Sequence, residues 1–92
     1  MNRAELTNEI HKDFAHMHHQ DVKGATSTVI EAMTEVLAEN GRVEVRGFGT
    51  FSVRQRNPRV ARNPKSNEKV SVGERKAVYF RPGKLLKARV NR

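Results

Sequence analysis

The chain has 92 residues, no cysteine and a formal net charge of +8 at pH 7. This length predicts a single domain with a small hydrophobic core, so we expect a second subunit to complete that core. The lack of cysteine excludes disulfides, thiolate metal sites and cysteine nucleophiles. The basic balance favours a polyanionic partner, most commonly a nucleic acid.

The charge is divided between the two parts of the sequence. Residues 1–40 carry three cationic and seven acidic side chains, whereas residues 41–92 carry fifteen and three. This segregation predicts that the second part faces a polyanion. No apolar run is long enough to span a membrane and no apolar signal segment follows Met1, so the sequence predicts a cytoplasmic chain.

Residues 1–40 are predicted to form two helices. Asn2 and Glu5 have the spacing of a capping pair at the start of the first helix. A connector is expected near residues 17–19, and Asn40-Gly41 ends the second helix. Apolar residues recur at helical spacing in two stripes, one of Leu6, Ile10 and Phe14 and one of Val22, Ala25, Val29, Met33, Val36 and Leu37.

After Gly41 the apolar period changes from about four to two, which predicts strands. Residues 42–46 alternate polar and apolar side chains, and a glycine corner at residues 47–49 leads into a second strand. Val78 and Phe80 share one face of a third strand. The Pro-Gly dipeptide that follows opens a short final helix.

Residues 54–76 contain eight cationic and only two acidic side chains, with too few apolar residues to cover a core. Their residual period of two predicts a long two-stranded ribbon that reaches away from the body, with its turn near residues 63–67. A basic loop without fixed structure is the alternative. The cationic residues are Arg54, Arg56, Arg59, Arg62, Lys65, Lys69, Arg75 and Lys76.

Three motifs in this order resemble the HU and integration host factor family of bacterial histone-like DNA-bending proteins. They are RGFGTF at residues 46–51, RNPK at residues 62–65 and FRPGK at residues 80–84. The resemblance covers essentially the whole chain. It implies an α+β fold in which two N-terminal helices form an intertwined dimer base, a three-stranded antiparallel sheet extends into a protruding β-ribbon arm, and a short C-terminal helix follows.

The resemblance also implies one DNA-binding domain over residues 1–92. Residues 1–40 would be the helical dimerisation base, residues 41–53 and 77–82 the sheet body, residues 54–76 the arm and residues 83–92 the C-terminal helix. A homodimer and a heterodimer with a related subunit both remain open. The implied dimer core consists of Val29, Met33, Val36, Leu37, Phe48, Phe51 and Phe80.

By resemblance, the chain binds double-stranded DNA through the minor groove and bends it, in support of compaction, recombination and transcription regulation in the bacterial nucleoid. Pro64 would be the intercalating wedge at the arm tip. No cofactor, metal, catalytic residue or small-molecule substrate is expected. The implied DNA-binding residues are Arg3, Arg46, Arg54, Arg56, Arg59, Arg62, Asn63, Pro64, Lys65, Lys69, Arg75, Lys76 and Lys84.

Residues 42–46 look most like the beta subunit of integration host factor. Glu44 and Arg46 lie two apart, so on a strand they would share a face, and the carboxylate could orient the guanidinium against the minor groove. A surface ion pair is the alternative reading.

The arm tip departs from the family pattern. Ala61 stands where glycine is usual, and Ser66-Asn67 stand where Thr-Gly is usual. Asn67 can still adopt a left-handed turn conformation, so a turn is expected there.

Three other functions compete with DNA bending. An RNA-binding or ribosome-associated protein would also use basic hairpins, but RNA readers stack bases on exposed aromatic side chains, and this chain has only four Phe and one Tyr.

A membrane-surface protein would need a basic face behind its apolar stripes, which residues 1–40 lack.

A metal site or enzyme is the third alternative. It would use His16, His18 and His19, with His11 nearby. These histidines lack the spacing of a helical zinc motif, so solvated connector histidines are the favoured interpretation.

Overall fold

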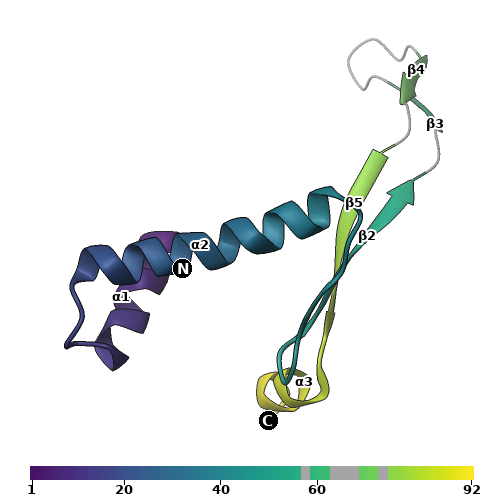
Figure 1. The fold of residues 1–92 in the computed structure, drawn as a ribbon. Coiled ribbons are helices and arrows are strands. Elements are labelled where there is room, and N and C mark those ends of the chain that lie inside the picture. The colour runs from purple at the N-terminus through teal and green to yellow at the C-terminus, as the bar shows by residue number, and fades with distance from the viewer. Residues whose placement is uncertain (57–58, 63–68, 73–74) are drawn as a thin grey trace. The chain divides into compact units, whose positions relative to one another are not determined.

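The computed structural model describes residues 1–56, 59–62, 69–72 and 75–92 (Figure 1). Of residues 56, 59–62 and 69–72 it describes the backbone only. The chain divides into two compact units, Met1–Glu35 and Val36–Arg92.

The first unit contains helix α1 (Arg3–Asp13) and most of helix α2 (His19–Ala38). Asn2 is the N-cap of α1, and its Oδ1 accepts the Glu5 backbone N–H at 2.9 Å, which confirms the predicted cap. Asp21 lies in the first turn of α2, where the helix dipole favours a carboxylate.

Hydrogen bonds tie the end of α1 to the start of α2. His11 Nε2 donates to the Met17 carbonyl oxygen, and His19 Nε2 donates to Asn8 Oδ1, each at 2.9 Å. The two imidazoles meet edge to face with ring centroids 5.3 Å apart. His11 and His19 lie on the helices beside the connector, and both rings make specific contacts at this exposed corner.

The second unit contains a three-stranded antiparallel sheet and a short helix, as predicted. Strands β1 (Val43–Val45), β2 (Gly49–Arg56) and β5 (Arg75–Pro82) lie in the order β1-β2-β5, and helix α3 spans Lys84–Val90 (Figure 1). Strands β3 (Arg59–Arg62) and β4 (Lys69–Val72) pair with each other in a two-stranded sheet.

The β1–β2 corner needs glycine, as the sequence predicted. The Phe48 N–H donates to the Val45 carbonyl at 2.9 Å, and Gly47 between them has φ +85°, in the left-handed region. The Gly83 N–H donates to the Phe48 carbonyl at 2.8 Å, which fixes the start of α3 beside this corner.

The two sheets share one register. Partners run from Gly49↔Pro82 to Arg56↔Arg75 in the first ladder and from Arg59↔Val72 to Arg62↔Lys69 in the second. The numbering of the partners in the second ladder continues that of the first. Residues 57–58 and 73–74, which come between the two ladders in the sequence, lie outside the described residues. These pairings are those of the predicted ribbon; its predicted turn at 63–67 lies outside the described residues.

The chain by itself buries little apolar surface. Phe48, Phe51 and Phe80 form a ring cluster with centroids 4.7 to 6.4 Å apart, yet Phe48 is 45% exposed. Val29 is 59% exposed, and Val22 is the one buried apolar side chain among the residues whose side chains are described. Exposure of this extent fits a core that a second subunit completes.

The most buried residue of α1 is polar. Thr7 is 2% exposed, and its hydroxyl donates to the Arg3 carbonyl at 3.0 Å, which satisfies it inside the helix. Phe14, the last member of the predicted apolar stripe, is 46% exposed.

Candidate nucleic-acid interface

The three-stranded sheet has one apolar and one polar face. Cross-strand partners share a face, and Phe51 pairs with Phe80 on the apolar one. The alternate residues lie on the other side, which we call the polar face; they include Thr50, Ser52, Arg54, Tyr79 and Arg81, and Glu44 as the partner of Thr50.

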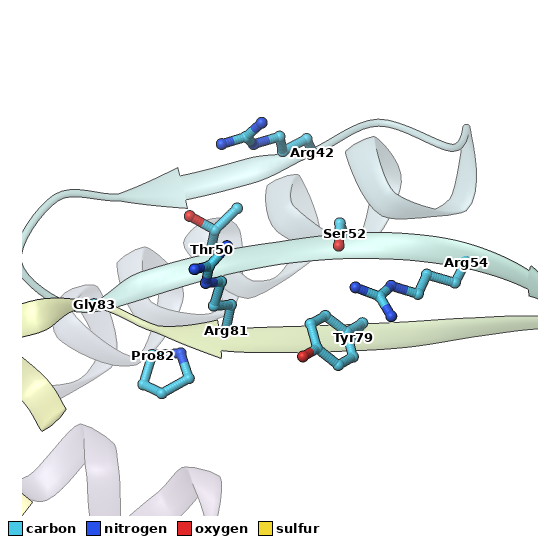
Figure 2. A pocket seen from close by; sticks show the side chains of 8 residues that line it. All are labelled: Arg42, Thr50, Ser52, Arg54, Tyr79, Arg81, Pro82 and Gly83. Atoms are coloured by element: carbon cyan, nitrogen blue, oxygen red, sulfur yellow. The ribbon is translucent and has the colours of Figure 1, made fainter.

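A hollow of about 410 Å³ lies over the polar face (Figure 2). Three guanidinium groups and three hydroxyl-bearing strand residues surround it, and no carboxylate lines it. Such a surface attracts and hydrogen-bonds anions. The lining residues are Arg42, Thr50, Ser52, Arg54, Tyr79, Arg81, Pro82 and Gly83.

Arg54 and Tyr79 form a stacked pair inside the hollow. The Arg54 Cζ lies 3.7 Å from the centroid of the Tyr79 ring (Figure 2). Because the ring is neutral, this cation–π contact holds the guanidinium without cancelling its charge.

Glu44 pairs with Arg42 rather than with Arg46. The Arg42 Nη2 donates to Glu44 Oε2 at 3.2 Å, and both side chains are 66% exposed. Strand β1 ends at Val45, so Arg46 lies in the turn and no longer alternates with Glu44 along a strand. The expected orientation of Arg46 by Glu44 is thus replaced by an exposed ion pair, a type worth about 0–1 kcal/mol.

The register of the ribbon places like charges opposite each other. Arg56 is the partner of Arg75, and Arg62 is the partner of Lys69. Like charges directly opposite destabilise an antiparallel pair by about 0.2–1 kcal/mol. A polyanion lying along the ribbon would remove this penalty.

The predicted site residues lie in several places. Strands β2 and β5 carry Arg54, Arg56, Arg75 and Lys76, and strands β3 and β4 carry Arg59, Arg62 and Lys69. Of Arg56, Arg59, Arg62 and Lys69 the structure describes the backbone only. The arm-tip residues Asn63, Pro64 and Lys65 lie outside the described residues.

The two predicted flank residues belong to different units. Arg3 is the first residue of α1, and Lys84 is the first residue of α3. Within the first unit, Arg3, His19 and Lys23 line a second hollow of about 320 Å³.

Sequence reasoning missed five residues that line the hollow of the polar face. For the four on β2 and β5 the signal that could have found them is the period of two, because each shares a strand face with Arg54 or is the partner of such a residue. Arg42 precedes β1, so this signal does not reach it. They are Arg42, Thr50, Ser52, Tyr79 and Arg81.

Neither a metal cluster nor a membrane span is present in the part of the chain that the structure describes. In that part, no three His, Asp or Glu side chains come together as metal ligands. None of its helices is long and apolar enough to cross a membrane.

The chain is similar over its full length to known proteins. The integration host factor subunit beta of Alkalilimnicola ehrlichii is 44% identical over 91 residues, 99% of this chain and 91% of that protein. The same subunit of Ralstonia nicotianae is 42% identical and covers 100% of this chain and 67% of that protein.

Solved structures show the same fold. HU in an Anabaena HU–DNA cocrystal structure has a TM-score of 0.89 and 30% identity, covering 98% of this chain and 97% of that one. A mutant of HU from Thermotoga maritima has a TM-score of 0.69 and 32% identity, over 98% of this chain and 99% of that one.

The family match agrees with these relatives. Residues 1–91 match the family described as bacterial DNA-binding protein, which is a family of DNA-binding proteins and not of enzymes. The chain therefore belongs to the bacterial DNA-binding protein family.

Proposed function

We propose that this chain is one subunit of an architectural protein that grips double-stranded DNA through the minor groove and bends it. The observation that carries the proposal is the register of the ribbon, which sets Arg56 opposite Arg75 and Arg62 opposite Lys69. Such an arrangement destabilises the ribbon in the free protein through repulsion between the facing cations, and it becomes favourable when DNA phosphates neutralise them. The cationic hollow on the polar face continues the basic surface into the sheet body.

The functional unit is a dimer of two copies or of this chain with a related subunit. The exposed apolar residues Val29, Val36 and Phe48 would be covered by the second chain, together with Met33, Leu37, Phe51 and Phe80. Each chain would act as one DNA-binding domain, with residues 1–40 as the dimerisation base and residues 54–76 as the arm. The similarity to integration host factor subunit beta and to HU supports this assignment.

The binding energy would come mainly from counterion release. Each Lys or Arg that neutralises a phosphate releases condensed cations, so about 6–10 contacts make affinity fall by about 10³–10⁵ between 50 and 200 mM salt. Arg3 and Lys84 would hold the flanks of the bent duplex. Bending would serve DNA compaction, recombination and transcription control in the nucleoid.

Pro64 would be the wedge at each arm tip. Its ring is rigid and apolar and it has no N–H, so it can enter a base step and unstack it. Unstacking one step costs a few kcal/mol in minor-groove architectural proteins generally, a class that already includes HU and integration host factor. Arg62 and Asn63 would hold the adjacent groove.

The experiment is fluorescence energy transfer across an end-labelled duplex of about 35 base pairs, well below the persistence length of about 150 base pairs. The wild-type protein is expected to shorten the end-to-end distance in a salt-sensitive manner. Pro64→Ala should retain salt-sensitive binding and lose much of the bend. Binding without any bend in the wild type would contradict the architectural function, and an unchanged bend in Pro64→Ala would contradict the wedge.

Competition with RNA tests the alternative function. The relatives do not favour an RNA-binding or ribosome-associated role. An unlabelled duplex RNA should displace the labelled DNA far less effectively than duplex DNA of the same length.

A further inference from the structure

We propose that Tyr79 is a positioning residue that holds Arg54 in its DNA-binding orientation on the polar face. The proposal rests on the proposed function, because it concerns how one arginine of that surface is prepared for DNA. The observation behind it is the stack of the Arg54 guanidinium on the Tyr79 ring, with Cζ 3.7 Å from the ring centroid.

The position of Tyr79 shows that its ring does not serve the apolar cluster. Tyr79 is the partner of Ser52, so it lies on the polar face, opposite the side of the sheet that carries Phe51 and Phe80. It is 42% exposed. A large ring on this solvent-facing surface contributes little to a core, and its ring contact is with a cation.

The register brings the two side chains together. Arg54 on β2 is the partner of Ala77 on β5, and alanine has one of the smallest side chains. Tyr79 lies two residues after Ala77 on β5, on the same face of the sheet. Diagonal neighbours of this kind are within reach of long and aromatic side chains. The small side chain of Ala77 leaves the guanidinium free to lean toward the ring.

The stack leaves the donors of Arg54 available. A guanidinium carries its five N–H groups in its plane, and stacking occupies only the face. The hollow around the pair is lined by Thr50, Ser52 and Arg81 and by no carboxylate, so no acidic side chain there competes for these donors. The edge of Arg54 can therefore reach a phosphate or a minor-groove acceptor while the ring holds its face.

The expected benefit is that Arg54 loses less conformational entropy when it binds DNA. A flexible arginine must be immobilised when it contacts DNA, whereas a stacked one has already lost much of that freedom. The loss of a cation–π contact and of this pre-orientation should weaken DNA binding by about three- to tenfold. The number of neutralised phosphates should not change.

The first measurement is made on the free protein. Ring currents of Tyr79 should shift the Arg54 side-chain proton resonances upfield in the NMR spectrum. The shift should persist in Tyr79→Phe, which keeps the ring and removes the hydroxyl, and disappear in Tyr79→Leu. Because no DNA is present, this measurement tests the stack separately from the proposed function. Unshifted Arg54 resonances in the wild type would overturn the proposal.

The second measurement is the affinity for a duplex of about 35 base pairs over a salt series. Tyr79→Leu should bind about three- to tenfold more weakly with an unchanged salt slope, and Tyr79→Phe should recover most of the loss. Arg54→Ala should lower the slope by about one. Adding Tyr79→Leu to Arg54→Ala should then have little further effect.

Lysine substitutions provide a matched control that leaves Tyr79 in place. Lysine keeps the charge but lacks the planar fork, so Arg54→Lys should cost more affinity than Arg81→Lys on the same face. Full additivity of Tyr79→Leu with Arg54→Ala, or equal losses for the two lysine variants, would overturn the proposal. A wild-type protein that keeps the stack but fails to bind duplex DNA would instead refute the proposed function.

Discussion

Lys12 in the helical unit Met1–Glu35 and Arg54 on the polar face of the sheet are two cations that are held in opposite ways. In the helical unit, Lys12 pairs with Glu9 at 2.8 Å, and the Thr7, Thr26 and Thr28 hydroxyls donate to carbonyls of their own helices. On the polar face, Arg54 is held by a neutral ring, and no carboxylate enters the hollow. Charge that is neutralised internally shapes a fold, whereas charge that is oriented but not neutralised can bind a polyanion.

The largest effect is expected from the ribbon. Replacing both Arg56 and Arg75 with alanine should lower the salt slope of DNA binding by about two, because two phosphate contacts are lost. The same change should slow hydrogen exchange of the ribbon amides in the free protein, because it removes the repulsion between these partners. Faster exchange in the variant would show that the two arginines stabilise the free ribbon.

A smaller effect is expected at the one acidic residue of β1. Glu44→Gln removes the ion pair with Arg42 and one negative charge near the polar face. DNA affinity should rise by about two- to fivefold, the range set by an exposed pair, with little change in thermal stability. Anisotropy titrations with the wild type as the control measure this. Weaker binding would mean that Glu44 itself orients a DNA-contacting group.

The smallest effect is expected in the helical unit. Lys12→Gln should leave the affinity for DNA and its salt slope unchanged, since this cation is satisfied by Glu9. The hydrogen bond and charge of Glu9 raise the pKa of Lys12 above its usual 10.5. Any stabilisation of the fold by this pair is complete at pH values below the ordinary lysine pKa. It is lost as the pH rises through the raised pKa of Lys12 in the folded protein. An NMR titration of Lys12 in the wild type and in Glu9→Gln measures the shift.

Much of the fold follows from local signals. The Asn2 cap, the change of period after Gly41 and the corner at Gly47 each depend on residues within a few positions of one another, and the structure confirms them. The burial of Thr7 was not predicted, because a hydroxyl satisfied by its own helix is cheap to bury and its sequence gives no sign of it.

The site was less accessible to prediction because it depends on pairing between strands. The cationic residues of the ribbon are visible in the sequence, but Tyr79 meets Arg54 only once the register of β2 and β5 is known. The Arg42–Glu44 pair was missed for a related reason, since one residue decides where β1 ends and whether Arg46 still alternates with Glu44.

The shared register of the two ladders restricts how the arm can change in length. Removing one residue from a single strand would turn every later side chain to the opposite face, so that cations and apolar groups would exchange places. Removing one residue from each strand at facing positions would keep the partners aligned. Arms of different reach are therefore accessible only through matched insertions or deletions, which offers a direct way to engineer how far along a duplex the protein extends.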